Sequence, residues 1–293
     1  MENIENEKII NRKKNKVKNT KKKGFSDKTL IHIILIFGAV LTILPFIWMI
    51  LTAFKTVSES MAIPPKIFPQ KWELSNFIEA FNTLPFKNLY INTLSFTVAA
   101  TIGQVIFCSM AGYVFARIDF WGRDFLFLLV LSVLMVPSQI FIIPQFQIIT
   151  ALKLSNTIRA LILPNLFSAF GTFLMRQYFI AIPDEIEEAA IIDGANHFTI
   201  FFKVMLPLVK PGIVSLVIST SLFTWNTLLW PLIVNTSKKS MTLSAGLASL
   251  QDIHTTNYPV LMAAALLAIW PMVVIFIIFQ RQFIEGIANR GGK

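Results

Sequence analysis

The sequence predicts an all-α polytopic membrane protein. Hydrophobic residues make up 55% of the 293 positions, charged residues only 14%, and the mean hydropathy is +0.65. A soluble domain of this length could not bury so much apolar surface, whereas a bilayer can cover it. Six apolar stretches of about twenty residues or slightly more recur along the chain, and each could cross a hydrocarbon core of ~30 Å as a helix. We therefore expect six transmembrane helices.

Polar or charged loops separate the six expected spans. These spans run from Leu30 to Leu51, from Leu89 to Phe115, from Phe125 to Phe146, from Ala160 to Ile180, from Gly212 to Val234 and from Val260 to Gln280. Pro45 in the first span can be tolerated as a kink, whereas Pro137 and Pro144 interrupt the third span. Between the first two spans, Phe54 to Lys87 is a polar loop long enough to form a small extracytoplasmic cap.

The distribution of basic residues predicts the orientation in the membrane. An even number of spans puts both termini on one side, which then holds 18 of the 26 Lys and Arg residues, with the remaining eight on the other side. The positive-inside rule therefore makes both termini cytoplasmic. Ten of these basic residues lie in residues 1–28, which we interpret as a disordered cytoplasmic tail. A nucleic-acid-binding arm is the alternative, but the adjoining membrane helix favours a role in orientation.

The segment from Pro183 to Pro211 is the most unusual part of the chain. Five of the 16 acidic residues lie in it, between two apolar blocks. Pro183 suits the first position of a helix, and Gly194 suits a left-handed stop. We therefore expect a short helix from about Asp184 to Asp193.

The two sides of this expected helix differ in chemistry. At about 100° per residue, one side carries Asp184, Glu185, Glu187 and Glu188, and the other carries Ile186, Ala189 and Ala190. Ile191 and Ile192 project beside the acids. A charged linker between membrane helices is the ordinary interpretation of such a loop. The mixture of acids with bulky apolar residues is more typical of a docking surface.

The spacing of residues in this segment matches a known motif. Glu188-Ala189-Ala190, three residues, Gly194, nine residues and then Val204-Met205-Leu206-Pro207 resembles the EAA loop of ATP-binding-cassette (ABC) importer permeases, with Val204 where isoleucine is usual. The Asp193-Gly194-Ala195 version is most similar to the carbohydrate-uptake, MalG-like branch. Other segments between about residues 88 and 280 carry the same resemblance: NTLSFTVAAT, AGYVFARIDFWGR, VPSQIFIIPQF and WNTLLWPLIV. The long basic tail and the C-terminal RQFIEGIANRGGK depart from the family pattern.

The resemblance implies the architecture of a type I ABC importer permease. Residues 1–28 would be a cytoplasmic tail and residues 29–293 the permease domain, with a transmembrane core at about 88–280 and a coupling loop at 183–211. In this family the loop forms the coupling helix, which inserts into a cleft of a cytoplasmic ATPase subunit and passes its closing motion to the membrane helices.

The resemblance also assigns roles to individual residues of the loop. The implied coupling residues are Glu188, Ala189, Ala190, Asp193, Gly194 and Pro207. The acids would cap or pair locally and with the ATPase, the alanines would permit close packing, and the glycine would let the chain turn sharply. Beyond this turn, we expect Phe198, Phe201 and Phe202 to bury against the membrane bundle.

Several partners follow from the same resemblance. They are a second, homologous permease that completes a heterodimer, two ATP-binding cassette ATPase subunits, an extracytoplasmic solute-binding protein and membrane lipid, with no role for nucleic acid. ATP and Mg²⁺ would bind to the ATPase subunits, and this chain would need no cofactor of its own. The expected location is the bacterial plasma membrane, which the chain crosses several times.

Uncharged polar side chains inside the spans mark a candidate substrate path. Such groups are costly in lipid and usually face the helix bundle or a water-filled path. The candidates are Gln104, Ser138, Gln139, Asn165, Thr224, Asn226 and Thr227. A sugar needs amides for hydrogen bonds and aromatic rings for stacking, so we assign Gln139, Trp225 and Asn226 to the path. Bonding between helices is the alternative role for Gln139 and Asn226, and the resemblance places most direct substrate contacts on the partner permease.

Motifs for catalysis and metal binding are missing from the sequence. It contains no GxxxxGK[ST], GxSxG or HExxH pattern, and its single cysteine and three scattered histidines predict no metal site. We therefore expect the permease subunit of an ATP-driven importer for a sugar or oligosaccharide. An ABC permease for another solute, such as a glycerol phosphodiester or polyol, is one alternative. A stand-alone secondary transporter is another, but the spans lack the buried carboxylate that ion coupling usually needs. A membrane scaffold without transport would make the polar span residues purely structural.

Overall fold

The computed structural model describes residues 29–251 and 256–288 of the chain. The predicted basic tail, residues 1–28, lies outside the described residues. The chain divides into two units, one that ends at Leu74 and one that begins at Ser75, and each is described separately. Every regular element in the described ranges is a helix.

The first unit is one long apolar helix followed by a compact loop. The helix Thr29–Ala53 has 25 residues, continues through Pro45, and contains the span expected at Leu30 to Leu51. The short helix α2 (Val57–Ser60) begins with a capping box, in which the Thr56 side chain accepts from the N–H of Glu59 and the Glu59 carboxylate accepts from the N–H of Thr56.

The loop after α2 folds back on the start of this segment. The Glu59 carboxylate accepts a second backbone hydrogen bond, from Gln70, at 3.1 Å. The N–H of Glu73 bonds to the carbonyl of Phe54 at 2.9 Å, and the rings of Phe54 and Trp72 lie 5.2 Å apart. Part of the expected polar loop is thus ordered within the first unit, and its role as an extracytoplasmic cap stays a prediction.

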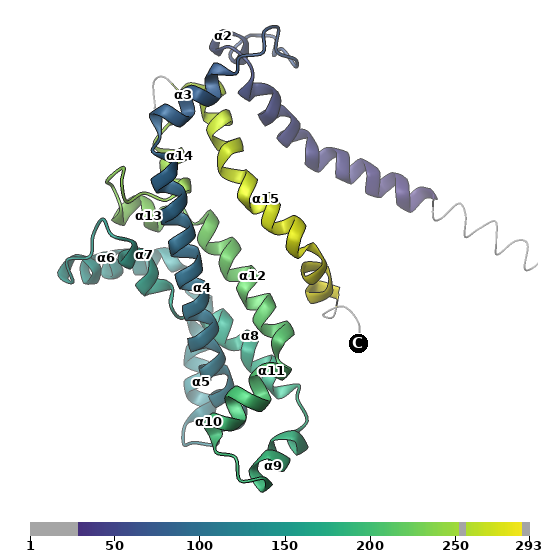
Figure 1. Cartoon of the computed structure of the whole chain (residues 1–293), viewed down its shortest axis with the longest axis vertical. Coiled ribbons are helices and arrows are strands. Elements are labelled where there is room, and N and C mark those ends of the chain that lie inside the picture. Colours follow the sequence, from purple (N-terminus) through teal and green to yellow (C-terminus); the bar gives the residue numbers. More distant parts are fainter. Residues whose placement is uncertain (1–28, 252–255, 289–293) are drawn as a thin grey trace, which may run out of the picture. The chain divides into compact units, whose positions relative to one another are not determined.

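The second unit is organised around α4 (Phe86–Arg117), which corresponds to the second expected span (Figure 1). α8 (Ala169–Ile180) and α12 (Lys210–Asn226) pack along it. Glycines permit the close approach of α4 and α8. A Cβ atom on Gly112 would lie 2.7 Å from the Met175 Cβ, and one on Gly171 would lie 2.9 Å from the Cys108 Sγ. Small residues of this kind let helices pack closely where no water drives their association.

The third expected span, Phe125 to Phe146, is not one helix. α5 (Arg123–Ser132) and the 3₁₀ turn Val133–Met135 are followed, at a bend of 98°, by Ser138–Phe141 and α6 (Ile142–Ala151). Pro137 explains the break, because the residue before a proline avoids the helical region. Val136 is indeed extended, with φ −92° and ψ 124°.

The fourth and fifth expected spans are also interrupted. α7 (Ile158–Ile162) and the 3₁₀ turn Leu163–Asn165 meet α8 at 44°, with a break at residues 166–168. α12 ends at Asn226, because Thr227 is extended, and the separate helix α13 (Leu229–Val234) follows. The expected span from Gly212 to Val234 is therefore two helices, and Trp230 and Pro231 belong to the second of them.

The remaining helices complete the second unit. α15 (Tyr258–Ala288) covers the sixth expected span and packs against α3 (Ser75–Thr83) and α12, and α14 (Leu243–Ala248) lies against α4. Among the described residues, two unbroken helices are long and apolar enough to cross a membrane, and three bent pairs meet the same test together. The number of membrane crossings stays a prediction.

Candidate functional site: the 183–211 loop and its anchor on α4

The expected short helix is present as α9 (Asp184–Ile192). Three acids lie in its first turn, where they complement the positive end of the helix dipole. Gly194 has φ +80°, the left-handed conformation expected of a stop. The N–H groups of Gly194 and Ala195 bond to the carbonyls of Ile191 and Ala190 at 2.9 and 3.0 Å. The predicted helix and its glycine turn are thus confirmed.

The inward face of α9 differs from the one that we predicted. Glu187 is its one buried residue in the described structure, and Ala190 packs beside it on the apolar core. Ile186 and Ala189, which we expected to pack, are exposed. The acids therefore do not share one outward side, because the protein supplies Glu187 with internal partners that the helical pattern alone does not reveal.

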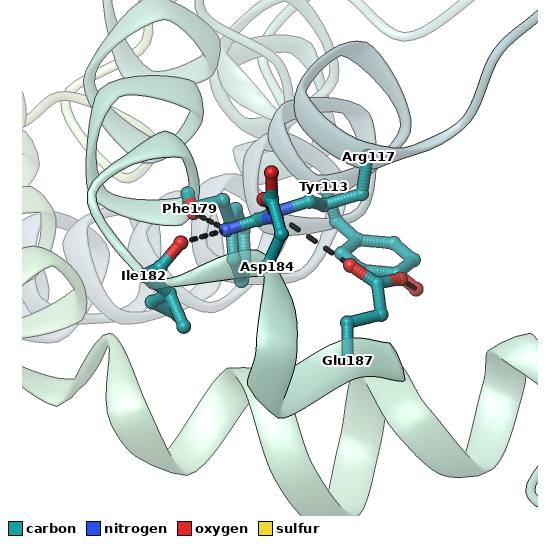
Figure 2. A network of polar contacts seen from close by, with 6 residues as sticks. All are labelled: Tyr113, Arg117, Phe179, Ile182, Asp184 and Glu187. Atoms are coloured by element: carbon teal, nitrogen blue, oxygen red, sulfur yellow. Dashed lines mark hydrogen bonds and ion pairs between the residues drawn. The ribbon is translucent and has the colours of Figure 1, made fainter. Parts of the chain in front are cut away.

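These partners belong to the last turn and a half of α4, and Figure 2 shows their arrangement. The Tyr113 hydroxyl donates to Glu187 Oε1 at 2.7 Å, and the Arg117 Nε lies 3.7 Å from Glu187 Oε2. Arg117 also pairs with Asp184, the first residue of α9. We call Tyr113, Arg117, Asp184 and Glu187 the Arg117 cluster. The side chains of Arg117 and Glu187 are only 7% and 11% exposed, so this pair is largely removed from water, whereas Asp184 is exposed.

Arg117 also binds the end of α8. Its Nη2 donates to the carbonyl of Phe179 at 2.7 Å and to that of Ile182, which lies in the link to α9. In return, the Nε of Arg176 on α8 donates to the carbonyl of Phe115 near the end of α4 at 3.1 Å. Cationic side chains at helix C-termini satisfy carbonyls that lack a partner within the helix and interact favourably with the dipole. Each helix thus caps the other.

An apolar core lies directly behind this cluster. The rings of Tyr113, Phe179 and Phe201 pack together, with centroids 5.2 to 6.2 Å apart, and Met175 and Met205 join them. Phe201 belongs to the π-helical turn Ile200–Met205, which follows α10 (His197–Thr199) and leads into α11 (Leu206–Leu208). This turn contacts α9 as well. The loop is therefore an ordered unit on the end of α4 and α8.

Of the three phenylalanines that we expected to bury, Phe201 alone does so. Phe198 is 72% exposed and Phe202 is also exposed, because neighbours on a helical turn point in different directions. Ile192, at 85%, and Ile191 are exposed too. We call Glu188, Ile191, Ile192 and Phe198 the outer patch of the loop. Exposed bulky apolar side chains beside acids are the feature from which the sequence predicts a docking surface.

Apart from Ala190, which packs on the apolar core, the expected coupling residues lie on this outward side of the loop or at its turns. Glu188, Ala189, Asp193 and Gly194 are exposed on α9 and at its end, Ala190 is half-buried, and Pro207 is exposed on α11. Among the described contacts, the internal ion pairs of α9 are made by Asp184 and Glu187. Sequence reasoning missed Arg117, Tyr113 and the inward role of Glu187. The spacing of three residues between Glu187 and Ala190 was the available signal, since it puts both on one helix face.

The expected substrate-path residues lie on separate elements. Gln139 is exposed beside the 98° bend, in the turn Ser138–Phe141. Trp225 is buried at the end of α12, where its carbonyl accepts from the Ser244 hydroxyl at 3.0 Å. Asn226 is exposed, and its amide donates to the carbonyl of Leu222 in its own helix, not to a neighbouring helix.

A second polar cluster lies midway along α4, at the break in front of α8. The Gln104 amide donates to the carbonyl of Asn165 at 3.0 Å and accepts from the Thr220 hydroxyl at 2.8 Å. We call Gln104, Asn165 and Thr220 the Gln104 cluster. It borders a cavity of about 420 Å³ that is also lined by Ser168, Ser219, Phe167, Phe170 and Phe223. One turn away, Thr224 donates to Thr97 at 3.3 Å.

The described residues hold no group of three or more His, Cys, Asp or Glu that could bind a metal ion. The part of the chain that the structure describes defines a class: a helical protein with apolar helices long enough to cross a membrane and an ordered helical loop. Residues 104–289 match the family described as binding-protein-dependent transport system inner membrane component. The chain belongs to this family, which confirms the resemblance found from the 188–207 motif and makes the chain a transport subunit in the inner membrane.

Similar proteins agree with this assignment. The arabinooligosaccharides transport system permease protein AraQ of Halalkalibacterium halodurans is 38% identical over 88% of this chain and 93% of its own length. The sn-glycerol-3-phosphate transport system permease protein UgpE of Yersinia pestis is 32% identical over 88% of this chain and 95% of its own. A chain in the crystal structure of a bacterial ABC transporter involved in alginate import superposes with a TM-score of 0.75 and 21% identity, over 86% of this chain and 94% of that one. The fold is therefore shared.

Proposed function

We propose that this chain is one permease subunit of an ATP-driven ABC importer that carries a sugar or oligosaccharide across the plasma membrane. One observation carries this proposal: inside the region that matches the family, the EAA-type motif forms an ordered helix with an exposed acidic and apolar patch. A cytoplasmic ATPase subunit would bind this surface. Hydrolysis of ATP, with its Mg²⁺, would then take place on separate subunits.

The topology and partners are part of the same proposal. Six crossings with both termini and α9 in the cytoplasm put the loop where an ATPase can reach it. A second, homologous permease would supply the other half of the path, two ATPase subunits would bind one loop each, and an extracytoplasmic binding protein would deliver the solute. Residues 29–293 would form the permease domain and residues 1–28 its cytoplasmic tail.

Several observations support a sugar as the solute. The relative AraQ is named for arabino-oligosaccharides. The cavity beside α4 is lined by amides, hydroxyls and three phenylalanine rings without a charged side chain, which suits a neutral ligand rich in hydroxyls. A phosphorylated solute, as in the name of UgpE, would call for a cation to pair with its charge. Gln139, Trp225 and Asn226 stay our candidates for the path, and the exposed amides of Gln139 and Asn226 leave hydrogen-bonding groups accessible.

The test is purification of the chain from native membrane in mild detergent, with identification of the proteins that copurify. We expect an ABC ATPase and a second permease with an EAA loop, and ATP-driven uptake of an oligosaccharide when the complex is placed in liposomes with its binding protein. A chain that purifies alone and carries solute without ATP would instead be a secondary transporter. A complex that takes up only glycerol phosphodiesters would refute the sugar assignment and leave the rest of the proposal standing.

A further inference from the structure

We propose that the Arg117 cluster is the element that transmits motion from α9 to the membrane helices. In this role Arg117, Tyr113 and Glu187 are positioning residues for transport, distinct from the outer patch that would meet the ATPase. This inference rests on the proposed function, and it concerns how the loop is attached to its own chain.

The first argument is that α9 has little else to hold it. The helix has nine residues, too few for a helix to be stable by itself in water. Glu187 is its one buried side chain in the described structure, with Ala190 and Ala195 in smaller apolar contacts on the core. Most of its bulky apolar side chains point outward. Beside the Arg117–Asp184 pair and these smaller contacts, Glu187 is therefore the main buried attachment of α9.

The second argument is that a single guanidinium joins three segments. Arg117 comes from the last turn of α4, and it binds Glu187 and Asp184 of α9 as well as the carbonyls of Phe179 and Ile182 at the end of α8. The planar fork of arginine can satisfy several acceptors at once in a fixed geometry, which a lysine ammonium cannot do. Figure 2 shows these acceptors around the guanidinium.

The third argument concerns what moves when α9 is pushed. α4 packs along α8 and α12, so a displacement of its last turn is a displacement of the helix bundle. The hydrogen bond from Tyr113 and the charge pair with Arg117 oppose any sliding of Glu187 over the core, because a buried carboxylate separated from its partners is strongly destabilised. The cluster therefore makes α9 and α4 move as one rigid body.

The experiment compares single variants of this chain in the purified, fully assembled importer in nanodiscs or liposomes. The variants are Glu187→Gln, which removes the charge, and Tyr113→Phe, which removes one hydroxyl and keeps both charges. The control is Asp119→Asn, because Asp119 forms an exposed ion pair with Arg123 just beyond the end of α4 and makes no contact with α9 among the described ion pairs. The quantities measured are assembly with the ATPase, ATP hydrolysis, solute uptake, and the ratio of solute taken up to ATP hydrolysed.

We expect Glu187→Gln to assemble and hydrolyse ATP while its ratio of uptake to hydrolysis falls by at least about fivefold, the lower end of a typical coupling between sites. Tyr113→Phe should lower the ratio by a smaller factor, and Asp119→Asn should leave it unchanged. Removal of an outer-patch acid, as in Glu188→Gln, should instead weaken assembly with the ATPase. The two measurements therefore distinguish the attachment of α9 to its own chain, which sets the ratio, from docking to the ATPase, which sets assembly.

Two results would overturn the inference. One is an assembled Glu187→Gln complex with the wild-type ratio. If Glu187→Gln fails to fold, as judged by thermal unfolding in detergent, the test rests on Tyr113→Phe. A wild-type ratio of uptake to hydrolysis in Tyr113→Phe is then the second result that would overturn the inference. A wild-type complex without ATP-driven uptake is a different result, because it would refute the proposed function whatever the variants do.

Discussion

The two polar clusters on α4 connect this helix to its neighbours by different chemistry. At its end, the Arg117 cluster uses an ion pair and charge-assisted hydrogen bonds to hold the end of α8 and the start of α9. Midway, the Gln104 cluster uses a neutral amide to hold the carbonyl of Asn165, at the break before α8, and the hydroxyl of Thr220 on α12. Charge is thus used beside the exposed loop, and an uncharged donor and acceptor are used within the apolar helix bundle.

This difference follows from the cost of burying each group. An ionised side chain at the centre of a bilayer is expensive, whereas an amide whose donor and acceptor are both satisfied costs little. At the helix ends the dipoles of α4 and α8 favour cations, so Arg117 and Arg176 are stabilised there. A charged cluster resists separation more strongly than a neutral one. We therefore expect the Arg117 cluster to be the stiffer connection, with the Gln104 cluster free to adjust.

The largest effect should come from removal of the guanidinium. Arg117→Met leaves Glu187 buried without a counter-charge and should destabilise the chain by about 3–5 kcal/mol, the usual cost of breaking a buried pair. Unfolding followed by denaturant titration in detergent measures the loss. Since Glu187→Gln removes the unpaired charge, the double variant should lose much less than the sum of the single variants. A loss below about 1 kcal/mol for Arg117→Met would mean that water reaches the pair.

We expect Gln104→Leu to lower the free energy of unfolding by a smaller amount than Arg117→Met does. The carbonyl of Asn165 would lose its donor, and the Thr220 hydroxyl would lose its acceptor, at a cost of about 1–3 kcal/mol. Gln177→Leu on the exposed side of α8 is the matched control and should stay within about 0.5 kcal/mol of wild type. If Gln104→Leu proved as damaging as Arg117→Met, the contrast between a stiff charged cluster and an adjustable neutral one would be lost.

Backbone geometry at the loop gives a third, still smaller test. Gly194 and Gly122 have φ +80° and +82°, and an added Cβ would meet no atom within 4 Å at either position. Valine at each should therefore cost a similar amount, about 1–2 kcal/mol, from the left-handed backbone alone. We expect Gly194→Val to lower uptake per ATP hydrolysed, because Gly194 sets the exit of α9, and Gly122→Val to leave this ratio unchanged. Normal uptake by Gly194→Val would contradict a coupling role for this turn.

Local signals in the sequence predicted much of this architecture. Pro183, the acids after it and Gly194 specify α9 from residues that are neighbours in the chain, and the long apolar runs specify the helix Thr29–Ala53 and α4. The interruption expected at Pro137 is present as a bend of 98°, since proline restricts the residue before it, but the size of the bend was not predicted. The breaks at residues 166–168 and 227–228 carry no proline at the break itself.

The anchor of the loop was not predictable from local pattern, because its contacts join residues far apart in the chain. Tyr113 and Arg117 lie about seventy positions before Glu187, and the hydrogen bonds span 74 and 62 residues. Helical periodicity placed Glu187 with the other acids. The contact with Arg117, which comes from a distant part of the chain, explains why Glu187 faces inward instead. The same holds for Gln104, whose partners lie 61 and 116 positions away. Periodicity assigns a face to a residue, whereas the partner determines which face is buried.

Glu59 in the first unit is a carboxylate bound by backbone N–H groups, whereas Glu187 is bound by side chains. The N–H groups of Thr56 and Gln70 hold the pKa of Glu59 below its ordinary value of 4.5, against the opposing effect of burial. The lowered pKa means that the ionised form stabilises the loop, fully above pH 4.5 and progressively less as the pH falls through the lowered value. We expect acidification in this range to loosen the 56–73 loop reversibly, measured as a change in Trp72 fluorescence that is absent in Trp72→Phe. Glu59→Gln should remove this pH dependence, and a transition that persists in that variant would show that another acid controls the loop.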